Sequence, residues 1–173
     1  IVLQYVAGLI TVTDPAQLFA MVASKNGTIS AFDASLILQA AAGLIPPLSG
    51  NVPDGGLSKG VVMQASGALE MASPEATTNP EVVRVGLKLS NPANVYSVST
   101  VTKGDFDLVS IDAVNASLPE GWDMKWNVVG NELRFAAAGT TPLSGGEVAT
   151  IMVHLKNKES RLSFSTDAML NEN

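Results

Sequence analysis

Two acidic residues, Asp105 and Asp107, are spaced so that they could act together as an acid and a base. On a strand, residues two apart lie on the same face, and paired carboxylates are the groups that hydrolyse glycosidic bonds. Asp112 adds a third carboxylate to the same stretch. However, Lys103-Gly104-Asp105 is typical of a turn that leads into a strand, where acids are usually only solvated. We therefore expect no catalytic residues here and interpret the chain as a protein that is not an enzyme.

Two tryptophans, Trp122 and Trp126, could instead bind a sugar. Their spacing places both rings on one side of a strand, so exposed rings would form a platform on which a sugar stacks. Burial of both rings in a core is the alternative, and it is the commoner arrangement for such side chains. His154, the only histidine, is expected to be an ordinary surface residue on the polar side of its strand.

The composition argues against several classes of function. Sixteen Asp and Glu against ten Lys and Arg give a net charge of −6, whereas a nucleic-acid-binding surface needs dense basic side chains. The absence of cysteine removes disulfides, thiol nucleophiles and zinc–thiolate sites, and a single histidine argues against catalytic triads. No apolar run approaches the roughly 20 residues of a membrane-spanning helix. The acidic, cysteine-free composition favours a secreted or cell-surface bacterial protein.

The chain divides into two parts with different patterns. Residues 1–48 carry few charges and are rich in alanine, leucine and isoleucine, which predicts a small helical segment. Residues 45–56 contain three prolines and three glycines, which cannot sustain a helix or a central strand, so we place a linker at residues 49–57. Residues 58–173 show short alternating segments separated by turn residues, which predicts a β-domain. Because the first residues look like the inside of a helix, we interpret the chain as a fragment, truncated before Ile1.

The helical segment contains an internal repeat. Residues 3–10 recur as residues 38–45, with six of eight positions identical. Each copy is expected to form the last turns of a helix that glycine closes at the C′ position, followed by a leucine able to fold back on the helix. Ser30 and Asp33 have the spacing of a capping box, which predicts a helix start near Ser30. A further short helix is predicted to begin at Thr13-Asp14-Pro15.

The stretch that precedes the second copy resembles a known family. Asn26-Gly27-Thr28-Ile29-Ser30-Ala31-Phe32-Asp33, continuing to Gln39, resembles one half of a dockerin, a duplicated loop–helix module related to the EF-hand. The resemblance implies a calcium loop in which Asn26, Thr28 and Asp33 are ligands. In this sequence the first ligand position, normally Asp, is Val22, and the third is Ser24. We therefore expect helices held together by apolar contacts, with calcium binding as the alternative.

The same resemblance implies a set of partner-binding residues. In dockerins these residues cluster at the end of the loop and along the helix, and here the corresponding positions are Ala31, Phe32, Leu38 and Gln39. Because these residues are mostly small or apolar, they also suit packing against the β-domain of the same chain. We expect residues 1–48 to pack on that domain, since so short a segment cannot form a generous core by itself.

The second part predicts a β-sandwich. Apolar and polar residues alternate in residues 82–89, 132–137, 149–156 and 162–164, and further strand candidates are 58–65, 67–72, 94–101, 106–114 and 122–129. About nine short strands without a long intervening helix favour two packed sheets.

This second part also resembles a cohesin, a jelly-roll sandwich that receives dockerins in bacterial cellulosome-type assemblies. The resemblance lies in residues 82–91, 94–98, 106–114, 135–139 and 142–155, and it covers roughly residues 58–172. It implies a mainly β, jelly-roll-like sandwich with a dockerin-like helical segment in front. The implied function is non-catalytic protein–protein association in an extracellular bacterial assembly, with a cohesin- or dockerin-type partner. Carbohydrate binding by the sandwich and a purely structural spacer are the alternatives.

Overall fold

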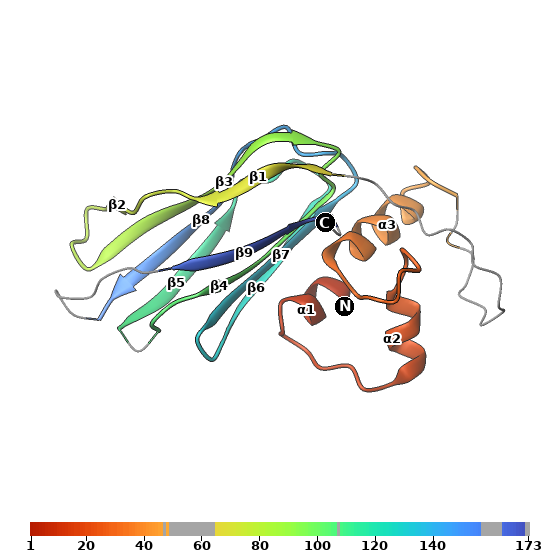
Figure 1. Ribbon diagram of the computed structural model, residues 1–173, viewed down its shortest axis with the longest axis horizontal. Helices are drawn as coiled ribbons and strands as arrows, with labels where there is room; N and C mark the ends of the chain where they lie inside the picture. The colour runs from red at the N-terminus through yellow and green to blue at the C-terminus, as the bar shows by residue number, and fades with distance from the viewer. Residues whose placement is uncertain (47, 49–64, 107, 157–163, 172–173) are drawn as a thin grey trace.

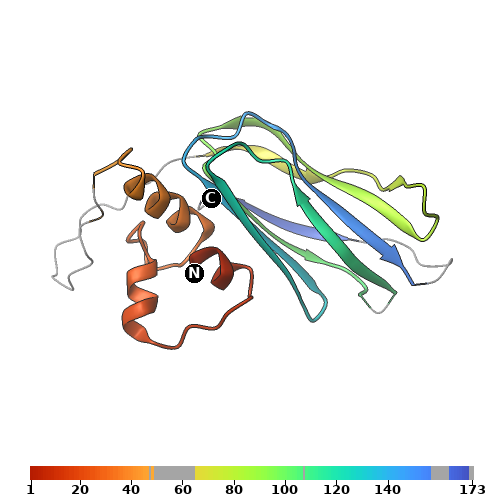
Figure 2. The ribbon, with the colours of Figure 1, turned by 180° about the vertical axis from the view of Figure 1, so that it is seen from behind.

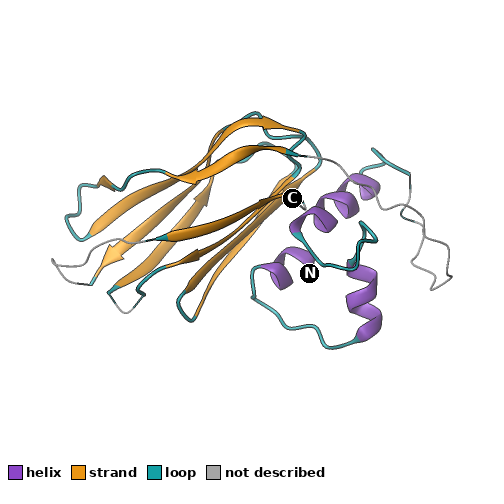
Figure 3. Ribbon diagram, viewed as in Figure 1, coloured by secondary structure: helices purple, strands orange, loops and turns teal. Residues whose placement is uncertain are grey.

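The computed structural model describes residues 1–46, 48, 65–106, 108–156 and 164–171. Within them, three short helices precede nine strands in two antiparallel sheets (Figures 1 and 3). This confirms the predicted fold class, a mainly β sandwich with a small helical segment. The expected linker and most of the strand expected at 58–65 lie outside the described residues. The elements are α1 (Val2–Val6), α2 (Pro15–Met21), α3 (Ala31–Ala41), β1 (Ser66–Met71), β2 (Glu75–Ala76), β3 (Val82–Ala93), β4 (Ser97–Lys103), β5 (Val109–Ala116), β6 (Trp122–Val129), β7 (Glu132–Gly139), β8 (Gly146–Leu155) and β9 (Ser165–Leu170).

The two sheets differ in size and exchange strands along the chain. The five-stranded sheet has the order β1-β3-β8-β5, with β2 also paired to β3, and the four-stranded sheet has the order β6-β7-β4-β9. The chain changes sheet after β3, β4, β5, β7 and β8, so most strands that follow each other in sequence do not pair. Most strand pairs therefore form only when distant parts of the chain meet.

The alternating residues noted in the sequence form the core between the sheets. Val85 and Leu87 of β3 and Val153 of β8 contribute from the five-stranded sheet, and Leu133 and Phe135 of β7 contribute from the four-stranded sheet. Each is almost completely buried, and burying one such side chain stabilises the fold by roughly 1.5–3 kcal/mol. The opposite residues of each strand consequently point outward, and they decide what each outer face can bind.

Several strand boundaries differ from those expected. β4 begins at Ser97, three residues later than predicted, because Asn94 has a φ of 56° and so turns the chain before the strand. β9 begins at Ser165, after the expected 162–164 segment, whose first residues lie outside the described ranges. β2 was not expected, because two residues are too few to show an alternation.

The helix boundaries follow the capping signals. The Asp14 carboxylate accepts a hydrogen bond from the Ala16 N–H at 3.0 Å, which starts α2 as predicted. At α3, Ser30 Oγ accepts from the Phe32 N–H and Asp33 accepts from the Ser30 N–H at 2.8 Å, so the predicted capping box is present.

The internal repeat is a repeated helix ending. Gly8 and Gly43 adopt φ values of 72° and 71°, and the following leucine N–H donates to the carbonyl of Gln4 in one copy and of Gln39 in the other. Both copies therefore close by the same left-handed turn, as predicted. The side chains of these two leucines are 44% and 61% exposed, so neither is buried against its helix.

The helices lie against one end of the sandwich (Figures 1 and 2). α1 and α3 contact β7, α1 also contacts β6, and α3 also contacts β4. α2 lies farther from the strands in both views. The short helical segment thus packs on the β-domain, as expected from its small apolar core.

Candidate protein-docking face

The outer surface of the four-stranded sheet carries small residues where the helices pack. In β7, Leu133, Phe135 and Ala137 point into the sandwich core, so Ala136 and Ala138 point outward. Ser97 of β4 lies directly opposite Ala138 and therefore points to the same side. Ala136 and Ala138 on this outer side are nevertheless completely buried. We call Ser97, Asn127, Ala136, Ala138 and Gly139 the docking face.

Apolar side chains from all three helices belong to a buried cluster that includes the alanines of this docking face. Val2 and Leu3 of α1, Met21 of α2, and Ala31 and Ala34 of α3 form one buried cluster with the two alanines of β7. Alanine has no side chain beyond Cβ, so helix backbones can approach a strand of alanines closely. The small size of the β7 residues thus makes room for a helix.

Two hydrogen bonds join the helices to the docking face, and a third, within α3, holds one of their donors. Ser35 Oγ of α3 donates to the Gly139 carbonyl at 2.7 Å, and Gln39 Nε2 donates to Ser35 Oγ at 2.9 Å. Asn127 Nδ2 of β6 donates to the Gly8 carbonyl at 3.1 Å, at the closing turn of α1. Ser35 and Gln39 are buried, so these bonds also satisfy polar groups that would be costly to leave unpaired.

One hydroxyl of the docking face is not satisfied. The Ser97 side chain is completely buried, yet its Oγ has no hydrogen-bond partner within the described part of the chain. A buried hydroxyl without a partner costs about 1–3 kcal/mol. The fit between helices and sheet is therefore apolar and close, but polar complementarity is incomplete at Ser97.

The residues expected to bind a partner lie within this internal contact or beside it. Ala31, Phe32 and Gln39 are at most 5% exposed, and Leu38 is half-buried. Ala31 belongs to the cluster on the docking face, and Gln39 holds Ser35. Buried side chains cannot contact a separate protein, so in this conformation Ala31, Phe32 and Gln39 are unavailable to one.

The proposed calcium loop has its oxygen atoms occupied by N–H groups. Asp33 is completely buried, and its two carboxylate oxygens accept hydrogen bonds from the Ser24 and Ser30 N–H groups, both at 2.8 Å. Asn26 Oδ1 accepts from the Thr28 N–H at 2.7 Å.

A calcium ion would need those same oxygens and further carboxylates. Calcium sites use six to eight oxygens, usually with several acidic side chains, whereas this loop supplies only Asp33. Ser24 Oγ is buried without a partner among the described residues, but a hydroxyl brings no negative charge. The residues present therefore do not fit a calcium ion, and the capping role of Asp33 explains its position without one.

Sequence reasoning missed Asn171, which ties the end of the chain to the edge of the docking face. Its Oδ1 accepts from the Tyr96 and Ser97 N–H groups, and its Nδ2 donates to the Asn94 carbonyl at 2.8 Å. The residue is almost fully buried and has a φ of 52°. Asparagine tolerates this left-handed backbone better than most residues, which is the only local signal that could have indicated it.

The two tryptophans face the core and do not form an open platform. Trp122 and Trp126 are half-buried and pack against the core cluster from the inward side of β6. Trp122 Nε1 donates to the Thr141 carbonyl at 2.9 Å, and a Cβ at Gly139 would overlap its ring. The spacing correctly predicts that both rings lie on one side of the strand. Their contact with the core supports the burial alternative over the sugar-binding one.

The structure describes two of the three acidic residues considered for catalysis. Asp105 is exposed at a turn, Asp107 lies outside the described residues, and Asp112 is next to His154, 3.4 Å from its Nδ1. His154 Nε2 is 3.8 Å from Glu81. His154 is thus a half-buried outer residue of β8 between two exposed acids. Within the described ranges, no three acidic or histidine side chains come together as metal ligands.

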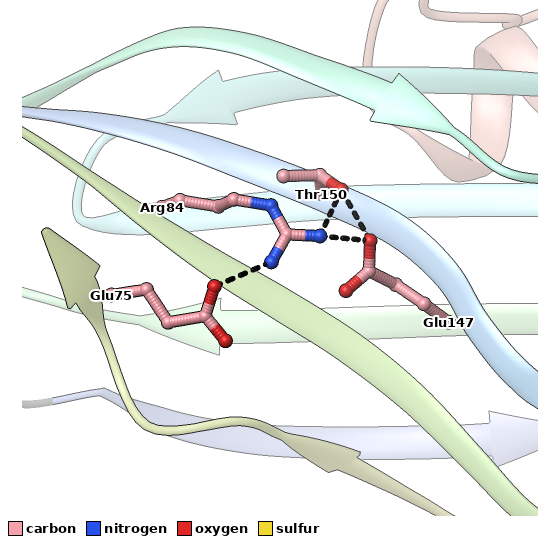
Figure 4. Close-up of polar contacts among 4 residues, drawn as sticks. All are labelled: Glu75, Arg84, Glu147 and Thr150. Carbon is pink, nitrogen blue, oxygen red and sulfur yellow. Dashed lines mark hydrogen bonds and ion pairs between the residues drawn. The ribbon is translucent and has the colours of Figure 1, made fainter. Parts of the chain in front are cut away.

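The outer face of the five-stranded sheet carries a charged cluster instead of alanines (Figure 4). Arg84 of β3 forms ion pairs with Glu75 of β2, at 2.8 Å, and with Glu147 of β8. Thr150 Oγ1 donates to Glu147 at 2.7 Å. A Cβ at Gly86 would lie against the Glu147 carboxylate, so glycine leaves the space that this carboxylate occupies.

This cluster changes the ionisation of its members. The hydrogen bond from Thr150 lowers the pKa of Glu147, and the positive charge of Arg84 lowers it further. The hydrogen bond to Glu75 and the charge of Glu147 raise the pKa of Arg84. The cluster is partly exposed, with Glu75 57% and Arg84 35% accessible, so solvent screens these interactions.

Comparisons with known proteins find likeness only among solved structures. No family model and no curated protein matches the chain. A non-cellulosomal cohesin from the archaeon Archaeoglobus fulgidus is 16% identical, with a TM-score of 0.40, over 53% of this chain and 69% of that one. A type II cohesin domain from the cellulosome of Acetivibrio cellulolyticus is 15% identical, with a TM-score of 0.45, over 61% and 75%. A chain of a type I cohesin–dockerin complex from Clostridium thermocellum is 16% identical, with a TM-score of 0.43, over 63% of this chain and 88% of that one.

These likenesses are distant, so the fold assignment rests on the strand pairing of this chain itself. Among the described helices, none is long and apolar enough to cross a membrane.

Proposed function

We propose that this chain is a non-catalytic protein-binding module, of the cohesin type, that works in an extracellular bacterial assembly. The observation that carries the proposal is the docking face: a sheet surface of alanine, serine and glycine on which helices are seated. The outward alanines of β7 are completely buried by a helical segment that is not part of the sandwich core. A sheet face that holds one helical segment has the shape needed to hold a similar one from a partner.

The chemistry of the docking face also supports a protein ligand over a carbohydrate. Its contacts combine small apolar residues with a buried backbone carbonyl, that of Gly139, which accepts from a serine. Sugar binding by such sandwiches relies on exposed aromatic rings, and the two tryptophans here pack against the core. The proposal includes an extracellular location and a dockerin-type partner, because the resemblance of the sequence to cohesins implies both.

The test is capture of extracellular proteins of the source organism on immobilised chain. Ala34→Arg should release the helical segment, because Ala34 is a buried member of the cluster on the docking face. Ala136→Arg places the same charge on the face itself, and Ala116→Arg is the matched control at an exposed alanine. We expect Ala34→Arg to increase capture of a dockerin- or cohesin-bearing protein and Ala136→Arg to abolish it. Equal capture by all variants, or binding to insoluble polysaccharide that Trp126→Ala removes, would overturn the proposal.

A further inference from the structure

We infer that the helical segment, residues 1–46, and the docking face form a recognition pair that also works between two copies of this chain, and that the contact within one copy competes with it. This inference rests on the proposed function, because it names the occupant of the same face. The partner it assigns is the helical segment of a second copy, seated as the chain's own segment is seated.

The contact contains both halves of such a pair. The apolar half consists of Val2, Leu3 and Ala34 on the segment and the two outward alanines on β7. The polar half consists of the Ser35 bond to Gly139 and the Asn127 bond to Gly8. None of these contacts is covalent, and each joins a residue before position 46 to one after position 96. A second copy offers every one of these groups in the same arrangement.

The connection between the two halves favours the contact within one copy. Residues 42–65, 24 in number, separate the end of α3 from the start of β1. Two binding elements joined within one chain meet at an effective concentration on the order of 1 mM. An intrinsic dissociation constant of about 10 μM between copies would therefore be weakened about 100-fold for each copy whose own segment must first be released. The unaltered chain should accordingly be monomeric at micromolar concentration.

The unsatisfied Ser97 hydroxyl makes this competition possible. It lies on the docking face beneath the helices and has no partner in the described residues. The cost of burying it lowers the affinity of the segment for the face, so the internal contact is weaker than its apolar area suggests. A contact of limited strength can be released, whereas a fully satisfied one would behave as part of the core.

The experiment mixes two full-length variants with complementary defects. The acceptor, Ala34→Arg, has an impaired segment and an intact docking face. The donor, Ala136→Arg, has an intact segment and an impaired face. We expect light scattering and size-exclusion chromatography to show a one-to-one heterodimer at tens of micromolar, while each variant alone and the unaltered chain stay monomeric. Fluorescence titration of the Ala34→Arg acceptor should give binding about 100-fold tighter with the Ala136→Arg donor than with an unaltered copy, whose segment must first leave its own face.

Controls separate folding failure from failure of the inference. Circular dichroism and thermal unfolding verify that the sandwich of each variant is folded, and Leu3→Arg with Ala138→Arg supplies a second acceptor and donor pair. A heterodimer that forms equally well with Ala116→Arg as the donor would show that release of the donor segment is not required, which overturns the competition. Monomers in both mixtures of folded variants overturn the inference. If the Ala34→Arg variant still captures another protein in that case, the proposed function stands without it.

Discussion

The outer faces of the two sheets use the same strand geometry but opposite chemistry. On the four-stranded sheet, outward alanines on β7 are completely buried by helices. On the five-stranded sheet, outward Arg84, Glu75 and Glu147 pair with each other and remain partly exposed. Small apolar residues leave room for a neighbour and gain free energy when water is removed, whereas paired charges lose hydration when they are covered. Side-chain size and charge, rather than strand pairing, therefore decide which face receives another element.

The largest loss of stability is expected when a charge is placed on the docking face. Ala136→Arg places an unpaired charge beneath the helices, which we expect to detach them and to lower the free energy of unfolding by about 3 kcal/mol. Chemical denaturation gives the energy, and limited proteolysis shows whether residues 1–46 become accessible. Ala116→Arg on β5 should change stability by less than about 0.5 kcal/mol. Equal stability of the two variants would contradict the assignment of Ala136 to a buried contact.

A smaller effect is expected when the polar contact across the interface is removed. Ser35→Ala leaves the buried Gly139 carbonyl without its donor and Gln39 without its acceptor. We expect a loss of about 1–3 kcal/mol in the free energy of unfolding, measured by urea denaturation. Ser117→Ala is the control, because Ser117 is exposed. No loss in Ser35→Ala would mean that the Ser35 bond to the Gly139 carbonyl does not stabilise the packing of the helices on the sheet.

Ser97 should respond in the opposite direction. Ser97→Ala removes a buried hydroxyl that has no partner in the described residues and keeps the small size of the side chain. We expect the free energy of unfolding to stay unchanged or to rise by up to about 1 kcal/mol. Thermal unfolding of this variant beside Ser35→Ala measures the contrast directly. A loss as large as that of Ser35→Ala would show that Ser97 makes an important hydrogen bond after all.

The charged cluster on the five-stranded sheet should make the stability of the chain depend on pH. The pKa of Glu147 is lowered in the folded chain, so its contribution to stability is present above its ordinary value of 4.5 and is lost as pH falls through the lower folded pKa. Glu147→Gln should therefore lose less stability than the unaltered chain between pH 5 and about pH 3. Denaturation at several pH values measures this difference, with exposed Glu120→Gln as the control. Parallel pH profiles for Glu147→Gln and the unaltered chain would contradict the expected role of the cluster.

The smallest effect is expected from calcium. Because N–H groups occupy the Asp33 oxygens and the loop has no other carboxylate, millimolar calcium or EDTA should leave the melting temperature unchanged. Differential scanning calorimetry with magnesium as the control tests this directly. A melting temperature several degrees higher in calcium, lost in Asp33→Asn, would show that the loop rearranges to bind the ion.

The sequence by itself determined the local structure of this protein. Alternating apolar residues indicated β3, β7 and β8, because side chains of a strand point to opposite faces. Ser30 with Asp33, and glycines 8 and 43, indicated how the helices begin and end, because caps use neighbouring residues only. The sandwich class followed from the number and length of the strands.

Only the tertiary structure decided what the outward residues do. The pattern of β7 is uniformly small from Ala136 to Gly139, so the sequence does not indicate which of these residues a helix covers. The Ser35 bond to Gly139 joins residues 104 positions apart, and the Asn171 bonds to Tyr96 and Ser97 join residues 75 and 74 apart. No local pattern contains such pairs, because their formation depends on the packing of whole elements. For the same reason Ala31 and Phe32, partner-facing by resemblance, were found buried only once the helices were placed on the sheet.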